Sequence, residues 1–240
     1  MFLKDFLRKN KFVYKFYRKI IFPNFLNKEI DIKKIRNFSF NVAIDIGANV
    51  GTYTVELQKN SKKVYSFEPI LRNVTYLSWL ADKNVKIKKY ALGSTNSKEF
   101  IYTPSEGKSS DFALSSLSNH LKYKINSRKQ LVSVKKFDDI LKNKKTLSKI
   151  DFVKIDVEGY EFNVLKGMSR LFLYSKPIFL IEIEKKHNPH YLKVLRFMLK
   201  RKYKIYFINE LKNFERLSQN NFVKFVKLGK VNNFWFINDF

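Results

Sequence analysis

Acidic residues stand at the ends of three apolar runs of the sequence, where each run gives way to turn residues. Asp45 ends the first and opens the segment Asp45-Ile46-Gly47-Ala48-Asn49-Val50-Gly51, Glu68 ends the second, and Asp156 ends the third. In open α/β sheets, ligands bind outside the carboxyl ends of the strands. A carboxylate after the first strand suits a ligand that carries a cation, because it would repel a phosphate.

Two glycines frame the turn after the first run. Gly47 and Gly51 let the backbone turn sharply and approach a ligand with no Cβ in the way. Their spacing is not the Gly-x-Gly-x-x-Gly of dinucleotide sites, but Glu68 is placed to accept both ribose hydroxyls of a nucleoside. Asn49 is either a turn residue or a ligand contact, and Pro69 is either a strand terminator or part of the site. The candidate cofactor-binding residues are therefore Asp45, Gly47, Asn49, Gly51, Glu68, Pro69 and Asp156.

A second set of residues could remove a proton from an acceptor. Asp156 and Glu158 lie between an apolar run and a helical stretch, and His187 follows a later run that ends in Glu182 and Glu184. A base within hydrogen-bond reach assists a weak hydroxyl nucleophile. The catalytic candidates are Asp156, Glu158 and His187, in that order. Glu158 could instead be a helix N-terminal charge, and His187 and Glu184 could be solvated. No His and acid spacing indicates a metal.

Short apolar runs alternate with helical stretches along most of the chain, which predicts a mostly parallel α/β sheet with helices on both faces. The stretch from 93 to 150 is too long for one crossover, so its two alternating segments, Glu99–Thr103 and Gln130–Lys136, predict an inserted hairpin whose tip, 105–118, suits a lid or substrate loop. The expected strands are 42–46, 63–67, 85–90, 151–156, 177–183, 204–208 and 234–237, and the expected helices are 51–59, 70–82, 159–173 and 189–201.

The first 36 residues form a basic, amphipathic pattern that predicts a helical extension. We place this extension at 1–38 and the main domain at 39–240. An apolar stripe flanked by Lys and Arg suits the surface of an anionic membrane. The same stripe could instead pack on the domain or on a second subunit.

Composition limits the classes of function. The 240 residues are 45% hydrophobic, with no apolar run long enough to span a membrane and no cysteine for a disulfide or a thiolate metal site. The N-terminus lacks the apolar core of a signal peptide, so we expect a cytoplasmic protein, peripheral at the inner face of the membrane if the extension binds lipid. The net charge of +27 comes mostly from Lys, whereas base readout favours Arg, which disfavours nucleic acid as a partner.

The order and spacing of these motifs resemble the FkbM family of methyltransferases over about residues 40 to 185. The resemblance implies a class I methyltransferase sheet and transfer of a methyl group from S-adenosylmethionine, typically to a hydroxyl of a sugar or secondary metabolite. It also implies that Asp45, Gly47, Asn49 and Gly51 line the cofactor, that Glu68 holds its ribose and that Asp156 flanks its methionine part. The motifs are Val42–Thr54, Phe67-Glu68-Pro69, Ala91-Leu92-Gly93, Leu114-Ser115-Ser116-Leu117, Phe137-Asp138-Asp139-Ile140-Leu141, Lys154-Ile155-Asp156-Val157-Glu158-Gly159 and Pro177–Glu182.

Two other functions remain open from the sequence. A nucleic-acid methyltransferase is favoured by the charge but disfavoured because no Asn/Asp-Pro-Pro-aromatic tetrapeptide follows the fourth strand. A non-catalytic membrane-surface or assembly module could retain the same fold. A small-molecule or glycan acceptor is the expected partner, and its identity and the oligomeric state stay open.

Overall fold

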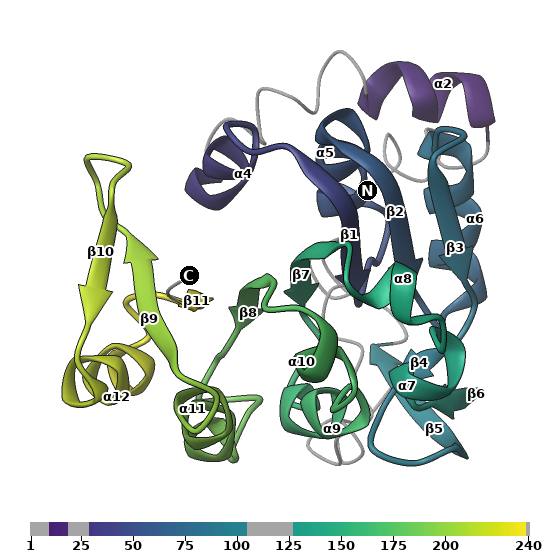
Figure 1. Cartoon of the computed structure of the whole chain (residues 1–240). Coiled ribbons are helices and arrows are strands. Elements are labelled where there is room, and N and C mark those ends of the chain that lie inside the picture. The colour runs from purple at the N-terminus through teal and green to yellow at the C-terminus, as the bar shows by residue number, and fades with distance from the viewer. Residues whose placement is uncertain (1–9, 19–28, 105–126, 239–240) are drawn as a thin grey trace.

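Five parallel strands form the centre of the computed structural model, which describes residues 10–18, 29–104 and 127–238 (Figure 1). Three further strands continue the sheet in antiparallel pairing. The sheet order is β10-β9-β11-β8-β7-β1-β2-β3, so the last strand lies between β8 and β9. The expected mostly parallel α/β class is confirmed. The strands are β1 (Phe40–Ile46), β2 (Ser61–Phe67), β3 (Val85–Lys88), β7 (Ile150–Ile155), β8 (Ile178–Glu182), β9 (Tyr203–Ile208), β10 (Phe214–Leu217) and β11 (Asn233–Asn238).

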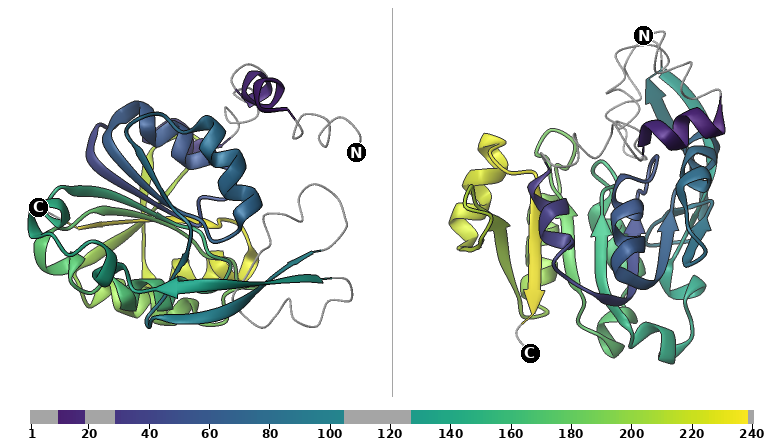
Figure 2. Two further views of the ribbon diagram at one scale, coloured as in Figure 1. Left: turned by 90° about the vertical axis from the view of Figure 1, so that its right-hand side faces the viewer. Right: turned by 90° about the horizontal axis from the view of Figure 1, so that it is seen from above.

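Helices cover both faces of this sheet (Figure 2). Since strand side chains alternate between faces, one apolar cluster includes Ala43, Phe152 and Trp235, and the other includes Ile44 and Val153. The first face carries α4 (Ile30–Ile35), α5 (Thr52–Asn60) and α6 (Leu71–Leu80). The second carries α7 (Phe137–Ile140), α8 (Lys144–Leu147), α9 (Glu161–Gly167), α10 (Leu171–Tyr174), α11 (Tyr191–Leu199) and α12 (Gln219–Leu228).

The expected inserted hairpin is present. β5 (Ser97–Pro104) pairs antiparallel with β6 (Ser127–Lys135), and the short strand β4 (Ala91–Leu92) pairs parallel with β6 to complete a second sheet. The hairpin lies beside the carboxyl end of the parallel strands, because Ile101 of β5 and Leu92 of β4 line the same cleft as β1 and β2 residues. The hairpin tip expected at 105–118 lies outside the described residues.

The helix expected over 159–173 is in fact two short helices, α9 and α10. Between them, Asp138 accepts hydrogen bonds from the Ser169 hydroxyl at 3.0 Å and from the Arg170 backbone N–H at 3.1 Å. Gly167 packs so tightly on the Gly93 carbonyl that a Cβ would lie 1.9 Å from its oxygen. These long-range contacts divert the chain from a helical path, which periodicity alone does not reveal.

The sequence pattern did not predict β10 or α12. β10 is a short edge strand whose charged residues, Glu215 and Arg216, are exposed, so it shows little apolar alternation. α12 begins after Ser218, whose hydroxyl accepts from the Asn221 N–H at 3.2 Å, and ends at Gly229. Its apolar contact with the sheet is narrow, since only two of its residues are buried.

Two described helices come from the expected N-terminal extension. α2 (Lys11–Phe16) buries Tyr14 against the rings of Tyr76 and Trp79 on α6, with centroids 5.1 and 5.7 Å apart. In α4, Ile32 and Ile35 are fully buried. Packing on the domain is thus seen for both helices, while residues 1–9 and 19–28 lie outside the described part and the boundary at 38 stays a prediction. Among the described helices, none has the length and apolar character needed to cross a membrane.

Candidate functional site

A cleft opens at the carboxyl ends of β1, β2, β7 and β8, at the edge of the sheet that the sequence predicts. Four of the parallel strands, the first turn of α6 and the inserted hairpin contribute to its wall. The lining residues are Ile46, Gly47, Asn49, Phe67, Glu68, Pro69, Ile70, Asn73, Ala91, Leu92, Ile101, Asp156, Val157, Glu158, Tyr160 and Glu182.

The turn after β1 is held tightly over the neighbouring strands. The backbone N–H groups of Gly47 and Ala48 both donate to the Phe67 carbonyl at 3.0 Å. Gly47 has φ +80°, and a Cβ there would lie 1.8 Å from the Asp156 carbonyl oxygen. Gly51 has φ +92°, and a Cβ there would lie 2.6 Å from a methyl carbon of Leu77. The glycines are therefore needed first for the close approach of backbone to backbone and of helix to helix.

Glu68 is the buried acid of the cleft, only 4% exposed. One carboxylate oxygen accepts from the Asn49 N–H at 2.8 Å, and the other accepts from the Ile70 N–H at 2.9 Å and Asn73 Nδ2 at 3.3 Å. Burial raises the pKa of Glu68 to about 7 in spite of these donors. Since each carboxylate oxygen has about two acceptor positions, the oxygen bonded to Asn49 can accept one further hydrogen bond.

Asp45 takes a different position from the one its spacing suggests. Its carboxylate is 1% exposed and accepts from the Thr54 hydroxyl of α5 at 2.5 Å, and Thr54 also contacts Ser66 at 2.8 Å. Burial raises the pKa of Asp45 to about 6, although the Thr54 bond opposes this. Asp45 and Gly51 lie behind the turn, whereas Gly47, Asn49, Glu68 and Pro69 are among the cleft-lining residues.

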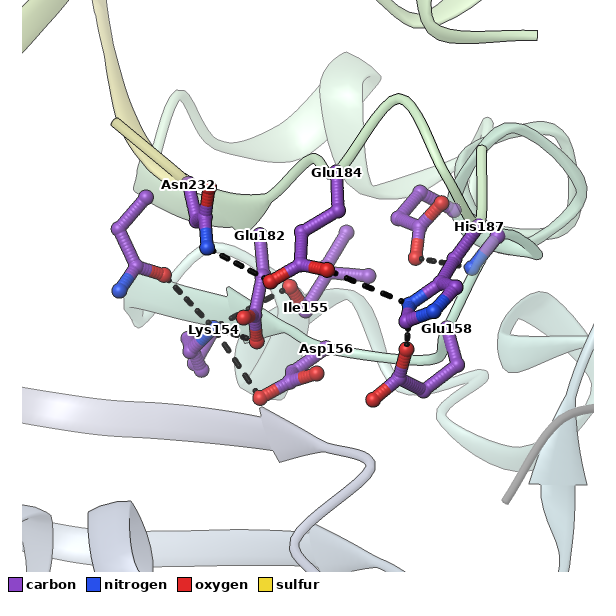
Figure 3. Close-up of polar contacts among 11 residues, drawn as sticks. Lys154, Ile155, Asp156, Glu158, Glu182, Glu184, His187 and Asn232 are labelled. Carbon is purple, nitrogen blue, oxygen red and sulfur yellow. Dashed lines mark hydrogen bonds and ion pairs between the residues drawn. The ribbon is translucent and has the colours of Figure 1, made fainter. Parts of the chain in front are cut away.

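The loop after β7 brings the catalytic candidates together (Figure 3). Glu158, at φ +52°, lines the cleft and places one carboxylate oxygen 2.6 Å from Nδ1 of the buried His187. Glu184 lies 3.4 Å from the same nitrogen and accepts from Asn232 Nδ2 at 2.6 Å. Burial, and then the charges of Asp156 and Glu184, raise the pKa of Glu158 to about 8. Asp156 shares the cleft wall but His187 does not, so His187 reaches the cleft through Glu158.

A buried acid fixes this loop from the side of α9. Glu161 accepts from the Gly159 N–H at 2.9 Å and from Asn188 Nδ2 at 2.5 Å, and Asn188 is the residue after His187. Burial raises the pKa of Glu161 to about 7. Glu161 thus links the loop that carries Glu158 to the segment that carries His187.

Two further residues belong to the site. Glu182 lines the cleft beside Asp156, and Lys154 lies fully buried behind both. The sequence pattern placed Glu182 at the end of a strand, where it could face the crevice, but assigned Lys154 no role. A charged residue inside the otherwise apolar run Phe152-Val153-Lys154-Ile155 was the available signal.

The cleft is acidic on a strongly basic molecule. Its described lining includes Glu68, Asp156, Glu158 and Glu182 and no Lys or Arg, while the chain has a net charge of +27. Such a wall attracts cationic or hydroxyl-rich ligands and repels phosphates. Within the described ranges, no group of three or more His, Cys, Asp or Glu is arranged to hold a metal ion.

Comparison with known proteins places this geometry in a family. The family model for the methyltransferase FkbM domain matches residues 45–205, from the acid near the end of β1 into β9. The chain belongs to the FkbM methyltransferase family. No curated protein matches the sequence.

Solved structures share the fold of this FkbM domain. The FkbM methyltransferase from Methylobacillus flagellatus KT superposes with a TM-score of 0.50 at 16% identity, over 82% of this chain and 43% of that one, so this chain spans less than half of its length. An rRNA methylase from Streptococcus thermophilus gives 0.45 at 12% identity over 87% and 92% of the two chains. Magnesium protoporphyrin IX methyltransferase from Synechocystis PCC 6803, with bound S-adenosylmethionine, gives 0.44 at 9% over 90% and 79%. The FkbM domain has the class I methyltransferase fold.

Proposed function

We propose that this protein transfers a methyl group from S-adenosylmethionine to a hydroxyl group of a sugar, glycan or other metabolite. The observation that carries the proposal is Glu68, a buried carboxylate that follows β2, faces the cleft and retains acceptor capacity beside the glycine turn. A carboxylate in this position can accept the hydroxyl protons of a ribose.

Asn49 supports the fit of the nucleoside. Its side-chain oxygen is buried in the turn and has no hydrogen-bond partner within the described part of the chain. A buried acceptor without a partner costs free energy, which a donor on a bound ligand would recover. Asn49 and Glu68 would therefore hold the nucleoside, and Asp156 with Glu182 would attract the ammonium group of the methionine part.

When bound, S-adenosylmethionine supplies the methyl group from its positively charged sulfonium. The chain itself contributes alignment, which can be worth about 7–11 kcal/mol in a two-reactant step. It also contributes Glu158, whose carboxylate can accept the proton that the acceptor hydroxyl releases. His187 Nδ1 lies 2.6 Å from the Glu158 carboxylate, so the imidazole is placed to orient the group that would accept this proton.

The charge of the cleft supports a neutral acceptor. A polyanionic acceptor would approach a cleft whose described lining includes the acids Glu68, Asp156, Glu158 and Glu182 and no Lys or Arg. Sugar hydroxyls are common partners of carboxylate acceptors, because each oxygen accepts up to two hydrogen bonds. The acidic wall therefore favours a polyol over nucleic acid.

Calorimetric titration with S-adenosylmethionine tests the proposal, with Glu68→Gln as the diagnostic variant. Both Glu68 oxygens accept hydrogen bonds from N–H groups, so the NH2 group of the substituted Gln would have to face one of these donors. We expect roughly 10- to 150-fold weaker binding, the equivalent of about 1.5–3 kcal/mol. Glu56→Gln is the matched control, since Glu56 is equally buried and its oxygens pair with Arg36 and Lys59 outside the cleft. Glu56→Gln should lower stability and leave affinity unchanged. Equal affinities for wild type and Glu68→Gln would contradict the site.

A further inference from the structure

A buried lysine lies directly behind the acidic wall of the cleft. The side chain of Lys154 on β7 has no exposure, and its ammonium donates to Asn233 Oδ1 at 3.2 Å and to the Ile155 carbonyl at 3.5 Å. The ring centre of Tyr53 is 4.9 Å away. Two hydrogen bonds, one of them long, and one ring do not replace the hydration that a buried ammonium gives up. The remaining stabilisation has to come from opposite charge.

Two carboxylates of the cleft supply that charge (Figure 3). Lys154 Nζ is 3.6 Å from Asp156 Oδ2 and 3.9 Å from Glu182 Oε2. The lysine side chain is 0% exposed, whereas those of Asp156 and Glu182 are 31% and 29% exposed. The cation therefore lies behind the two acids, and their other sides are available to a ligand.

Burial and the charges of neighbouring groups influence the pKa values of Lys154 and Glu182. Burial lowers the pKa of Lys154, but the charges of Asp156 and then Glu182 more than compensate, so this pKa lies above its ordinary value and the lysine stays charged. Burial, followed by the charge of Asp156, raises the pKa of Glu182. Two adjacent carboxylates without a counter-ion tend to retain one proton between them near neutral pH.

We propose that Lys154 is a positioning residue for the ligand, whose buried ammonium offsets the repulsion between the Asp156 and Glu182 carboxyl groups and holds them side by side so that they bind a primary ammonium group. This proposal rests on the proposed function, in which that ammonium belongs to the methionine part of S-adenosylmethionine. A lysine with a purely structural role would support the sheet without affecting one end of the ligand more than the other.

Two nucleosides separate these roles in calorimetric titrations of the full chain. S-adenosylhomocysteine carries the amino-acid part, and 5′-methylthioadenosine lacks it. We expect Lys154→Met to weaken S-adenosylhomocysteine binding by at least about tenfold at about pH 6.5 and to change methylthioadenosine binding less than about twofold. The charged or titratable groups that face this cluster are Asp31 of α4, Asp45 of β1, Tyr53 of α5, Asp156 and Glu158 after β7, and Glu182 of β8.

Two variants control the experiment. Lys59→Met removes an exposed lysine paired with Glu56 and should leave both affinities unchanged. If Lys154→Met does not fold, the double variant Lys154→Met/Glu182→Gln removes one charge of each sign and should show the same selective loss of S-adenosylhomocysteine binding. Wild-type affinity of Lys154→Met for both nucleosides, or equal losses for both nucleosides in the variant that folds, would overturn the proposal. If the wild type binds neither nucleoside, the proposed function itself fails.

Discussion

At the level of single residues, the site is built from carboxylates whose surroundings differ. Glu68 is held by three donors, Glu158 by a contact with His187, and Glu182 by the charge of Lys154. These surroundings suit three different roles, namely acceptance of hydroxyl protons, exchange of a proton, and binding of a cation. The sequence shows four acids near one edge of a sheet, and their neighbours distinguish them.

Glu158→Gln tests the proton-accepting role. The pKa of Glu158 is raised to about 8, first by burial, so the carboxylate becomes the free base as the pH rises through that value. We expect turnover to rise along the same limb in wild type and to fall by roughly 10²–10⁴-fold in Glu158→Gln, with the limb abolished. Cofactor affinity measured by calorimetry should change little, because the variant retains the size of the side chain. His187→Asn should shift the midpoint of the limb. A Glu158→Gln enzyme with full turnover and an unchanged pH profile would leave alignment as the whole mechanism.

At the level of elements, the turn after β1 depends on the glycine at position 47. Gly47 and Gly229 both have positive φ, but a Cβ at Gly229 would meet nothing within 4 Å, whereas one at Gly47 would meet the Asp156 carbonyl. Gly229→Ala should cost about 1–2 kcal/mol of unfolding free energy from the backbone alone. Gly47→Ala should cost about 1–3 kcal/mol more from overpacking, and should also weaken cofactor binding by moving the loop of Asp156. Denaturant unfolding of both variants measures the difference, and equal losses would show that the turn accommodates a Cβ at position 47.

Helix α2 of the N-terminal extension turns aromatic side chains both toward the domain and away from it. Tyr14 is buried on α6, while Phe12 and Phe16, one helical turn apart, are 81% and 61% exposed beside the exposed Lys11 and Lys15. We propose that this outer face contacts an anionic membrane, because aromatic and basic side chains together suit the interface.

Sedimentation with vesicles that contain an acidic lipid tests this contact. Phe12→Ser/Phe16→Ser should weaken binding by at least about tenfold, since a buried Phe side chain contributes about 1.5–3 kcal/mol. Leu173→Ser/Leu211→Ser is the matched control, because those residues are 76% and 80% exposed on other parts of the chain. Binding should also weaken with added salt. Wild-type protein that does not sediment with the vesicles would contradict the membrane contact. A changed oligomeric state in the Phe variant would instead indicate contact with another copy of the chain.

Across the whole molecule, several buried acids make folding depend on pH. The pKa values of Asp45, Glu68, Glu161 and Glu158 are raised to about 6, 7, 7 and 8, in each case first by burial. A raised folded-state pKa means that the folded chain binds more protons than the unfolded chain between the two values. Their contribution is therefore complete below the ordinary carboxyl pKa and is lost as the pH rises through about 6 to 8.

We accordingly expect the free energy of unfolding to fall between about pH 5.5 and pH 8.5 by at least about 1.4 kcal/mol, the equivalent of one pKa unit. Urea unfolding at a series of pH values measures the slope. Glu161→Gln should reduce this slope, because one of the four titrations is then removed. A stability that rises over this range would contradict the raised pKa values.

Features that depend on local order could be predicted from the amino-acid sequence alone. Strand and helix patterns indicated the parallel core and the inserted hairpin, and the acids at the ends of β1, β2 and β7 marked the edge of the sheet at which the cleft lies. Turn glycines and strand ends are local features, so Gly47, Asn49, Glu68, Pro69 and Asp156 could be recognised without knowledge of the packing.

The packing of distant segments determined which way each side chain faces and what surrounds it. Asp45 points to α5 because β1 side chains alternate, and Lys154 meets Asn233, 79 residues away, only because β11 inserts beside β8. The Glu158 contact with His187 likewise requires two loops that the sheet brings together. Pairing between distant segments has no signature in a single sequence, since it depends on strand order and on the burial of charge rather than on local periodicity.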